Sequence, residues 1–187
     1  PPFILRTAER TAADPDAPRV ATATLPLELT RFVGREGLLA ELSGARVRLL
    51  TLTGPGGIGK TRLALELARA HAGDAWFVPL AAVTDPARLP EAIADALGLP
   101  RPAGLDEVAR ALDGRPALLV LDNLEQLDAA STVRALLERA PTCAVVATSR
   151  RRLGLAGERE QPLGPLPVEA GVELFVDRTR AVRPDFE

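Results

Sequence analysis

The sequence predicts an α/β fold in which a parallel β-sheet lies between two layers of helices, and three observations lead to this class. Segments with strand character alternate along the chain with segments of helical periodicity, which is typical of a doubly wound sheet. The stretches 117–121 and 143–148 are almost entirely apolar, as expected of strands that are buried on both faces. A glycine-rich turn at 54–59 also joins a strand-like stretch to a helix-like one.

The individual elements follow from the residue types, taken in order. We expect residues 1–24, which are rich in Ala, Thr, Pro and Asp, to form a poorly ordered linker, and residues 25–166 to form the core domain. Strands are predicted at 47–53, 75–80, 117–121, 143–148 and 159–163, and helices at 35–43, 61–72, 86–97, 105–112, 131–140 and 168–182. Asp85 is expected to cap the third helix, and Gly73 is expected to end the second.

Residues 54–61 read Gly-Pro-Gly-Gly-Ile-Gly-Lys-Thr and match the phosphate-binding pattern G-x-x-x-x-G-K-[ST]. Such a loop directs backbone N–H groups and a helix N-terminus at a polyphosphate. Lys60 is the only lysine in a chain with 23 Lys and Arg residues, and we expect it to contact the β- and γ-phosphates, where a compact ammonium fits better than a guanidinium. The loop residues expected to line the nucleotide are Gly54, Gly56, Gly57, Ile58 and Gly59.

The residues on either side of the phosphate site suggest a metal ion. The hydroxyl of Thr61 is placed to bind Mg²⁺, and Asp122, at the end of the buried strand 117–121, is predicted to hold the same ion from the opposite side. The alternative role for Asp122 is an N-cap of the following turn. Arg62 is a candidate phosphate contact, although a solvated side chain is the interpretation that we favour.

Two further charged residues are candidates for the catalytic machinery. A fast ATPase would commonly have Glu at the position of Asn123, and Glu125 could polarise the attacking water instead. The alternative role for Glu125 is a solvated acid in the first turn of a helix. Arg150, which follows the strand 143–148, is predicted to sense the γ-phosphate, whereas we interpret the two arginines after it as solvated.

Composition excludes several classes of function. The formal net charge of −2 argues against a nucleic-acid-binding surface on this chain. No apolar run approaches the ~20 residues of a membrane span, so we expect no membrane partner. A single cysteine, Cys143, cannot form an intrachain disulfide and suits a reducing, cytoplasmic setting. Because the chain starts at Pro1 and contains no methionine, we expect it to be a fragment of a longer polypeptide.

Taken together, the motifs resemble a known group, the NB-ARC-type nucleotide-binding module of STAND ATPases, which are signal-transduction ATPases with numerous domains. The similarity covers about 25–187 and is closest to the bacterial modules in LuxR-type, SARP-type and cyclase-linked regulators. Five segments show the similarity: Leu27 to Glu36, Thr51 to Ala64 around the glycine-rich loop, Leu119 to Leu127, Ala147 to Arg150, and Leu163 to Pro167 with the helix that follows. In the third segment the residue after Asp122 is Asn, as it is in this group.

The resemblance implies further features of this chain. It implies a five-stranded sheet of order 5-1-4-3-2, with the strand that ends near Thr148 between the loop strand and the Asp122 strand. Phe32, Val33 and Arg35 would line the adenine pocket, and 167–187 would be the first helix of a helical lid that the chain leaves truncated. The implied function is a switch that ADP holds closed and ATP opens, often for oligomerisation.

Our interpretation from the sequence is therefore an ATP/ADP-binding regulatory switch with slow, Mg²⁺-dependent hydrolysis, within a larger signalling or transcription-regulating protein. The main alternative is an actively hydrolysing AAA+-like ATPase that uses Glu125. A small-molecule phosphotransferase would need an acceptor-substrate lid, of which the sequence shows no sign. DNA binding by this segment itself would need a basic surface and a recognition helix, and neither is apparent.

Overall fold

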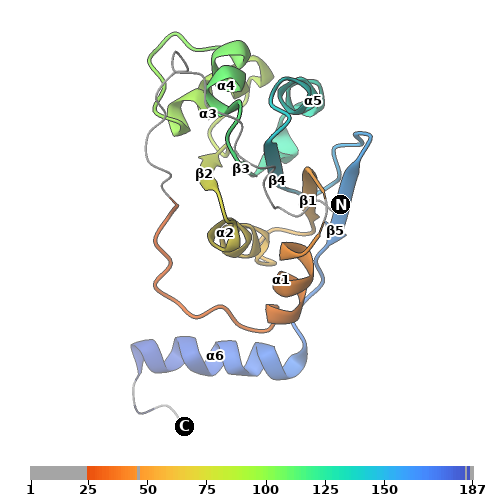
Figure 1. Ribbon diagram of the computed structural model, residues 1–187. Helices are drawn as coiled ribbons and strands as arrows, with labels where there is room; N and C mark the ends of the chain where they lie inside the picture. The colour runs from red at the N-terminus through yellow and green to blue at the C-terminus, as the bar shows by residue number, and fades with distance from the viewer. Residues whose placement is uncertain (1–24, 46, 184, 186–187) are drawn as a thin grey trace.

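A computed structural model of the chain describes residues 25–45, 47–183 and 185, and its centre is a parallel sheet with helices on both faces (Figure 1). The five strands are β1 (Leu49–Thr53), β2 (Asp74–Pro79), β3 (Ala117–Asp122), β4 (Cys143–Ser149) and β5 (Glu158–Pro162). Their order is β2-β3-β4-β1-β5, and every neighbouring pair is parallel. This is the predicted order 5-1-4-3-2 in the opposite direction, so both the fold class and the topology are confirmed. The expected linker, 1–24, lies outside the described residues.

The helices are α1 (Glu36–Ser43), α2 (Lys60–Ala70), α3 (Leu89–Ala96), α4 (Leu105–Leu112), α5 (Ala130–Arg139) and α6 (Val168–Val182), with short 3₁₀ turns η1 (Pro86–Arg88) and η2 (Leu124–Gln126). The helix predicted at 86–97 is divided between η1 and α3. Pro90, in the first turn of α3, has no N–H to continue the ladder, which explains the break. Asp85 caps η1 at the start of the predicted range, since its Oδ1 accepts a hydrogen bond from the N–H of Ala87 at 2.9 Å, whereas the N-cap position of α3 is Arg88.

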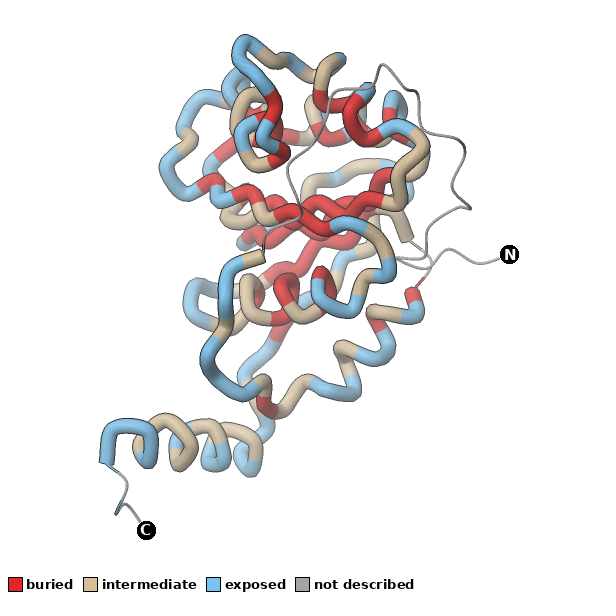
Figure 2. Tube along the Cα trace, turned by 60° about the vertical axis from the view of Figure 1, so that its left-hand side comes forward, coloured by how far each residue is buried: buried red, intermediate tan, exposed pale blue. Residues whose placement is uncertain are grey.

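The alternation of side chains along the strands builds two cores, one on each face of the sheet. On β3, Leu118 and Val120 pack with α1 and α2, whereas Leu119 and Leu121 pack with α3, α4 and α5. The tube coloured by burial shows the central strands as a buried band between the two helical layers, whereas β5, at the edge, has no buried residue (Figure 2). All seven residues of β4 are buried, as a central strand requires. Because β1, β3 and β4 are parallel, the loops that follow them leave the same edge of the sheet.

The second helix ends earlier than predicted, and Gly73 is not its cap. The capping position is His71, which has an extended backbone. Gly73 instead lies against the chain that enters β3, because a Cβ built on it would stand only 2.0 Å from the carbonyl oxygen of Pro116. The glycine is needed for a close approach between two segments that are far apart in sequence, which no local pattern reports.

Replacing Gly73 by Ala should lower the free energy of unfolding by about 1–3 kcal/mol, since the backbone must move to admit the new methyl group. Gly37→Ala, in α1, is the matched control, because a Cβ there meets nothing within 4 Å. Chemical denaturation followed by circular dichroism would compare the two variants. Equal stability of Gly73→Ala and Gly37→Ala would contradict the steric explanation.

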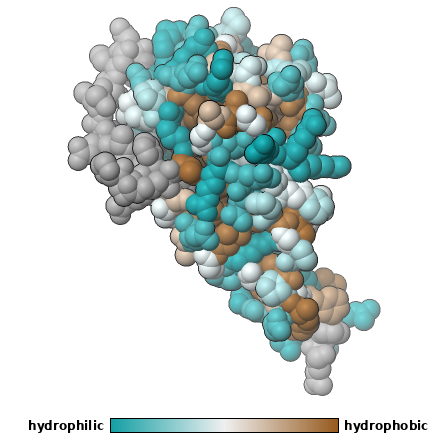
Figure 3. All heavy atoms as spheres, turned by 90° about the vertical axis from the view of Figure 1, so that its right-hand side faces the viewer, coloured by the Kyte–Doolittle hydropathy of each residue, from teal (hydrophilic) through white to brown (hydrophobic). Residues whose placement is uncertain are grey.

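Helix α6 forms an arm at the edge of the molecule and contains no buried residue. Several large apolar side chains on it are exposed, among them Val168, Val172, Phe175 and Val182, and hydrophobic side chains gather on this arm in the space-filling view (Figure 3). Its first turn nevertheless packs closely on the core domain, since a Cβ on Gly34 would lie 2.5 Å from the Cβ of Ala170. No helix in the described part of the chain is both long and apolar enough to cross a membrane.

Candidate nucleotide-binding site

The glycine-rich loop wraps the N-terminus of α2 in a conformation that its glycines permit. Gly59 precedes the helix with a φ of 91°, in the left-handed region that side chains disfavour. A Cβ on Gly54, whose φ is 144°, would stand 2.9 Å from the carbonyl oxygen of Leu163. Strand, loop and helix are therefore arranged as the sequence motif predicts.

Lys60 is the first residue of α2, and its side chain is folded back over the loop. The residue is only 8% exposed, and its Nζ donates hydrogen bonds to the carbonyl oxygens of Gly54 and Pro55, each at 2.9 Å. These two contacts place the ammonium group inside the curve of the loop. Its one remaining donor can be used by an anion at the centre of that curve.

The hydroxyl of Thr61 joins the loop to the neighbouring strand. It donates to the Oδ1 of Asp122 at 2.6 Å, and the hydroxyl of Thr148 donates to the same oxygen at 2.7 Å. Thr148 in turn accepts the N–H of Asn123 at 2.9 Å. Asp122 is thus held in place by groups from α2 and β4, and the residue at the N-cap position of η2 is Asn123, so the alternative role for Asp122 as that cap is not observed.

Thr148 is the residue of this network that sequence reasoning missed as a partner of Asp122. The sequence pattern at the end of this strand predicts a sensor of the γ-phosphate at Arg150, not a support for the carboxylate. The signal was available in principle: Thr148 is a polar residue near the carboxyl end of a buried strand, and β4 is the neighbour of β3.

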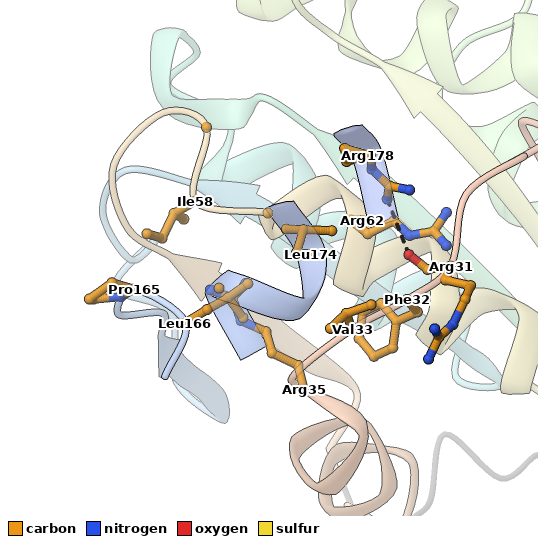
Figure 4. Close-up of a pocket in the computed structure, with 13 residues that line it drawn as sticks. Arg31, Phe32, Val33, Arg35, Ile58, Arg62, Pro165, Leu166, Leu174 and Arg178 are labelled. Carbon is orange, nitrogen blue, oxygen red and sulfur yellow. Dashed lines mark hydrogen bonds between the residues drawn. The ribbon is translucent and has the colours of Figure 1, made fainter. Parts of the chain in front are cut away.

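The residues that the family resemblance assigned to adenine line a cavity of about 470 Å³ beside the loop (Figure 4). Phe32, Val33 and Arg35 enter it from the segment before α1, and Gly57 to Gly59 of the glycine-rich loop form another side. Leu174 and other residues of α6 and its approach form the remaining wall. The α6 wall is more than a hundred positions away in sequence from the other two groups, and the fold brings all three together around a largely apolar space whose volume is typical of ligand sites.

Two arginines of the cavity are held by defined contacts. Arg35 donates from Nη2 to the carbonyl oxygen of Gly164 at 2.8 Å, and burial lowers the pKa of its guanidinium from the ordinary value. Arg62, for which we favoured a solvated side chain, is instead paired with Glu28 at 2.5 Å and with Glu66 at 3.1 Å, and its side chain is only 22% exposed. The interpretation of Arg62 as solvated was therefore wrong.

Glu125 and Arg150 lie away from this cavity. They form an ion pair of 3.2 Å, in which the side chain of Arg150 is 71% exposed and that of Glu125 is 17% exposed. Glu125 lines a separate hollow of about 520 Å³, next to Ser149 and Arg151. The two candidate catalytic residues thus occupy the same edge of the sheet as Asp122, but they contact each other and not the loop.

The donor set at Thr61 and Asp122 fits a hard cation with oxygen ligands. Within the described ranges, no group of three or more His, Cys, Asp and Glu side chains could hold a metal ion by itself. A cation here would therefore take most of its ligands from phosphate oxygens and water, which is how Mg²⁺ is usually bound at nucleotide sites.

Comparison with known proteins now identifies the domain, since residues 45–158, more than half of the chain, match the family model described as "AAA domain". The chain belongs to the AAA domain family. The matched range of this AAA domain runs from just before β1 to the start of β5 and contains the loop, Asp122 and Thr148. The P-loop of such a domain is a nucleotide-binding site, in agreement with the geometry described above.

Curated relatives of this AAA domain are longer proteins. An uncharacterized protein of Mycobacterium tuberculosis is 42% identical over 173 residues, which span 84% of this chain and 43% of that protein. A protein of the same organism named as an HTH-type transcriptional regulator is 41% identical over 76% of this chain and 17% of its own length. The regulatory protein AfsR of Streptomyces griseus is 34% identical over 92% of this chain and 20% of its own length. The chain thus spans less than half the length of these relatives.

Two solved structures share the fold of this AAA domain. Cdc6p from Pyrobaculum aerophilum superposes with a TM-score of 0.64 at 19% identity, over 84% of this chain and 52% of that one. A STAND protein with a tetratricopeptide repeat sensor from Pyrococcus horikoshii superposes with a TM-score of 0.55 at 20% identity, over 90% of this chain and 28% of that one. At these identities the likeness concerns the fold alone.

Proposed function

We propose that the chain is the ATP/ADP-binding switch module of a larger regulatory protein and that it hydrolyses ATP slowly in the presence of Mg²⁺. The observation that carries this proposal is the 2.6 Å hydrogen bond from Thr61 to Asp122, which places a hydroxyl and a carboxylate directly behind the phosphate loop. The regulatory setting is supported by the names of two relatives, an HTH-type transcriptional regulator and the regulatory protein AfsR.

In this proposal the loop amides and Lys60 bind the polyphosphate, while Thr61 and Asp122 would hold Mg²⁺. The ion, when bound, neutralises charge on the β- and γ-phosphate oxygens. Thr148 keeps the carboxylate of Asp122 in place through its own 2.7 Å hydrogen bond. The cavity lined by Phe32, Val33 and Arg35 receives the adenine and the ribose.

Slow hydrolysis is proposed because of the residue after Asp122. Asn123 has a φ of 69°, in the left-handed region. Asn adopts this conformation far more readily than other residues with a side chain, so the position suits Asn and would strain the Glu of a fast ATPase. Its N–H is committed to Thr148, so the local role of Asn123 is to hold the end of β3 against β4. No acid next to Asp122 is therefore left to polarise the attacking water.

Measured turnover should accordingly fall at least ~100-fold below the ~10 s⁻¹ of ordinary enzymes. A steady-state assay of phosphate release with ATP and Mg²⁺ tests this, with nucleotide binding measured in parallel by calorimetry. Turnover near ~10 s⁻¹ would contradict the switch and would favour the AAA+-like alternative. In that alternative Glu125 polarises the water, so Glu125→Gln stops hydrolysis and leaves binding intact. Glu138→Gln, an exposed acid of α5, is the control.

The remaining parts of the proposal concern the larger protein. Residues 25–166 are the nucleotide-binding core and 167–187 begin a helical lid, whose exposed apolar side chains pack on other domains of the parent chain. Nucleotide state governs self-association of the whole protein in the cytoplasm. With its net charge of −2, this segment leaves any DNA binding to other domains.

A further inference from the structure

The wall of the cavity formed by Phe32 belongs to a segment with no regular secondary structure, Leu25–Phe32, which we call the strap. Apolar burial does little to hold its middle part, because Leu27 is 82% exposed and Leu29 is 86% exposed. Leu25 and Phe32, at the two ends of the strap, pack on the core around α2, but its middle part must be fixed mainly by polar contacts. Two arginines of α2 provide such contacts: Arg62, and Arg69 two turns later.

Arg62 makes more contacts with the strap than Arg69 does. Its Nη1 pairs with Oε2 of Glu28 at 2.5 Å, and its Nη2 donates to the carbonyl oxygen of Thr30 at 2.6 Å. Its guanidinium carbon also lies 5.9 Å from the centre of the Phe32 ring, within range of a cation–π contact. One forked side chain thus fixes three residues of the strap, including the ring that lines the cavity.

The guanidinium of Arg62 also pairs with a residue of the same helix. Glu66, one turn further along α2, pairs with Nη2 of Arg62 at 3.1 Å, which leaves the arginine few other orientations. Arg62 also directly follows Thr61 in the chain, so the phosphate-binding turn and the support of the strap belong to the same turn of one helix. Figure 4 shows the Arg62 side chain next to Phe32 and Arg31, on the cavity side of the strap.

We propose that Arg62 is a positioning residue for nucleotide specificity. It holds Phe32 in the orientation in which a large flat base can pack on the ring. This inference rests on the proposed ATP/ADP-binding function and adds to it the residue that selects the purine base. Arg62 contacts the base wall and leaves the phosphates to Lys60 and the loop.

The test is the ratio of the dissociation constants for UDP and ADP, measured on the protein by competition against a fluorescent nucleotide. The two ligands carry the same diphosphate and ribose, so the ratio reports the base alone. We expect the wild type to prefer ADP at least ~10-fold, since a purine offers more surface to an aromatic wall. Arg62→Ala should reduce this preference to within ~2-fold, with most of the loss in ADP affinity.

Two control variants distinguish a specific effect on base selection from a general loss of order in the strap. Arg69→Ala removes a comparable pair of contacts, to the carbonyl oxygen of Pro26 and to Glu66, but Arg69 does not line the cavity, so the preference for ADP should remain. Arg62→Lys keeps the charge but loses the fork, so it should restore only part of the preference. If Arg69→Ala and Arg62→Ala reduced the preference for ADP equally, the proposal would be overturned.

Other outcomes are equally decisive. A wild type that binds ADP and UDP alike, or an Arg62→Ala variant whose preference is unchanged, would also overturn the role of Arg62, while the proposed nucleotide-binding function stands. A parallel loss of affinity for both ligands in Arg62→Ala would place Arg62 at the phosphates instead. If the wild type binds neither ligand, the proposed function itself fails.

Discussion

Replacing Lys60 by alanine is expected to weaken the binding of ATP and ADP at least ~100-fold, which corresponds to about 2.7 kcal/mol or more. The Nζ of Lys60 lies inside the ring of the loop, where it donates to the carbonyl oxygens of Gly54 and Pro55. Because the residue is 8% exposed, its charge acts on a phosphate with little screening by water. Removing it also leaves these two carbonyl oxygens without the ammonium that they contact.

Isothermal titration calorimetry of the wild type and Lys60→Ala would measure this effect. Lys60→Arg is the informative control, because it keeps the charge but must place a larger planar group in the same space, so we expect it to bind almost as poorly. Lys60 is also the only lysine of the chain, so protection of its amine against acylation by bound nucleotide gives a second readout. Unchanged affinity of Lys60→Ala would refute the nucleotide-binding assignment.

Asp122→Asn should abolish the contribution of Mg²⁺ to nucleotide binding. In the wild type we expect Mg²⁺ to raise ATP affinity by ~10-fold or more, because Thr61 and Asp122 would hold the ion, which would neutralise part of the phosphate charge. An amide in place of the carboxylate has no charge to hold the ion, although it can still accept the hydroxyl hydrogen bonds of Thr61 and Thr148. The variant should therefore stay folded and lose its response to the metal.

The measurement compares ATP dissociation constants with Mg²⁺ and with a chelator, for the wild type and the variant. Asp128→Asn is the matched control, since it removes an exposed carboxylate only a few residues along the chain. If Asp122→Asn keeps the full response to Mg²⁺, the ion is not held here. A loss of affinity that is the same with and without the metal would assign Asp122 a purely structural role.

The regular part of the fold could be predicted from the sequence because its signals are local. Apolar runs marked β3 and β4, helical periodicity gave Leu105–Leu112 and Val168–Val182 with the observed bounds, and the loop motif has a fixed spacing. The strand order came only from the family resemblance, since nothing in a short apolar strand specifies its neighbour.

Apart from the helix that Pro90 divides, the main errors and omissions concern contacts between distant segments. Gly73 was expected to end a helix because glycine often does, but its real constraint is the carbonyl group of Pro116. Arg62 was expected to be solvated because its partner Glu28 is more than thirty positions away. Thr148 was not connected with Asp122 because their hydrogen bond depends on the register of two strands. Such contacts depend on geometry that residue types and spacing do not contain.

The position of Trp76 gives the protein a natural optical reporter. It is the only tryptophan, the chain has no tyrosine, and the side chain is 1% exposed in the core between the sheet and helices α3 to α5. The core around α2 and the cavity beside the loop lie on the other face of the sheet. The fluorescence of Trp76 should therefore change when the hydrophobic core unfolds and should not change when a ligand binds in the cavity. One sample can then report folding through this indole and binding through an added dye, without overlap between the two signals.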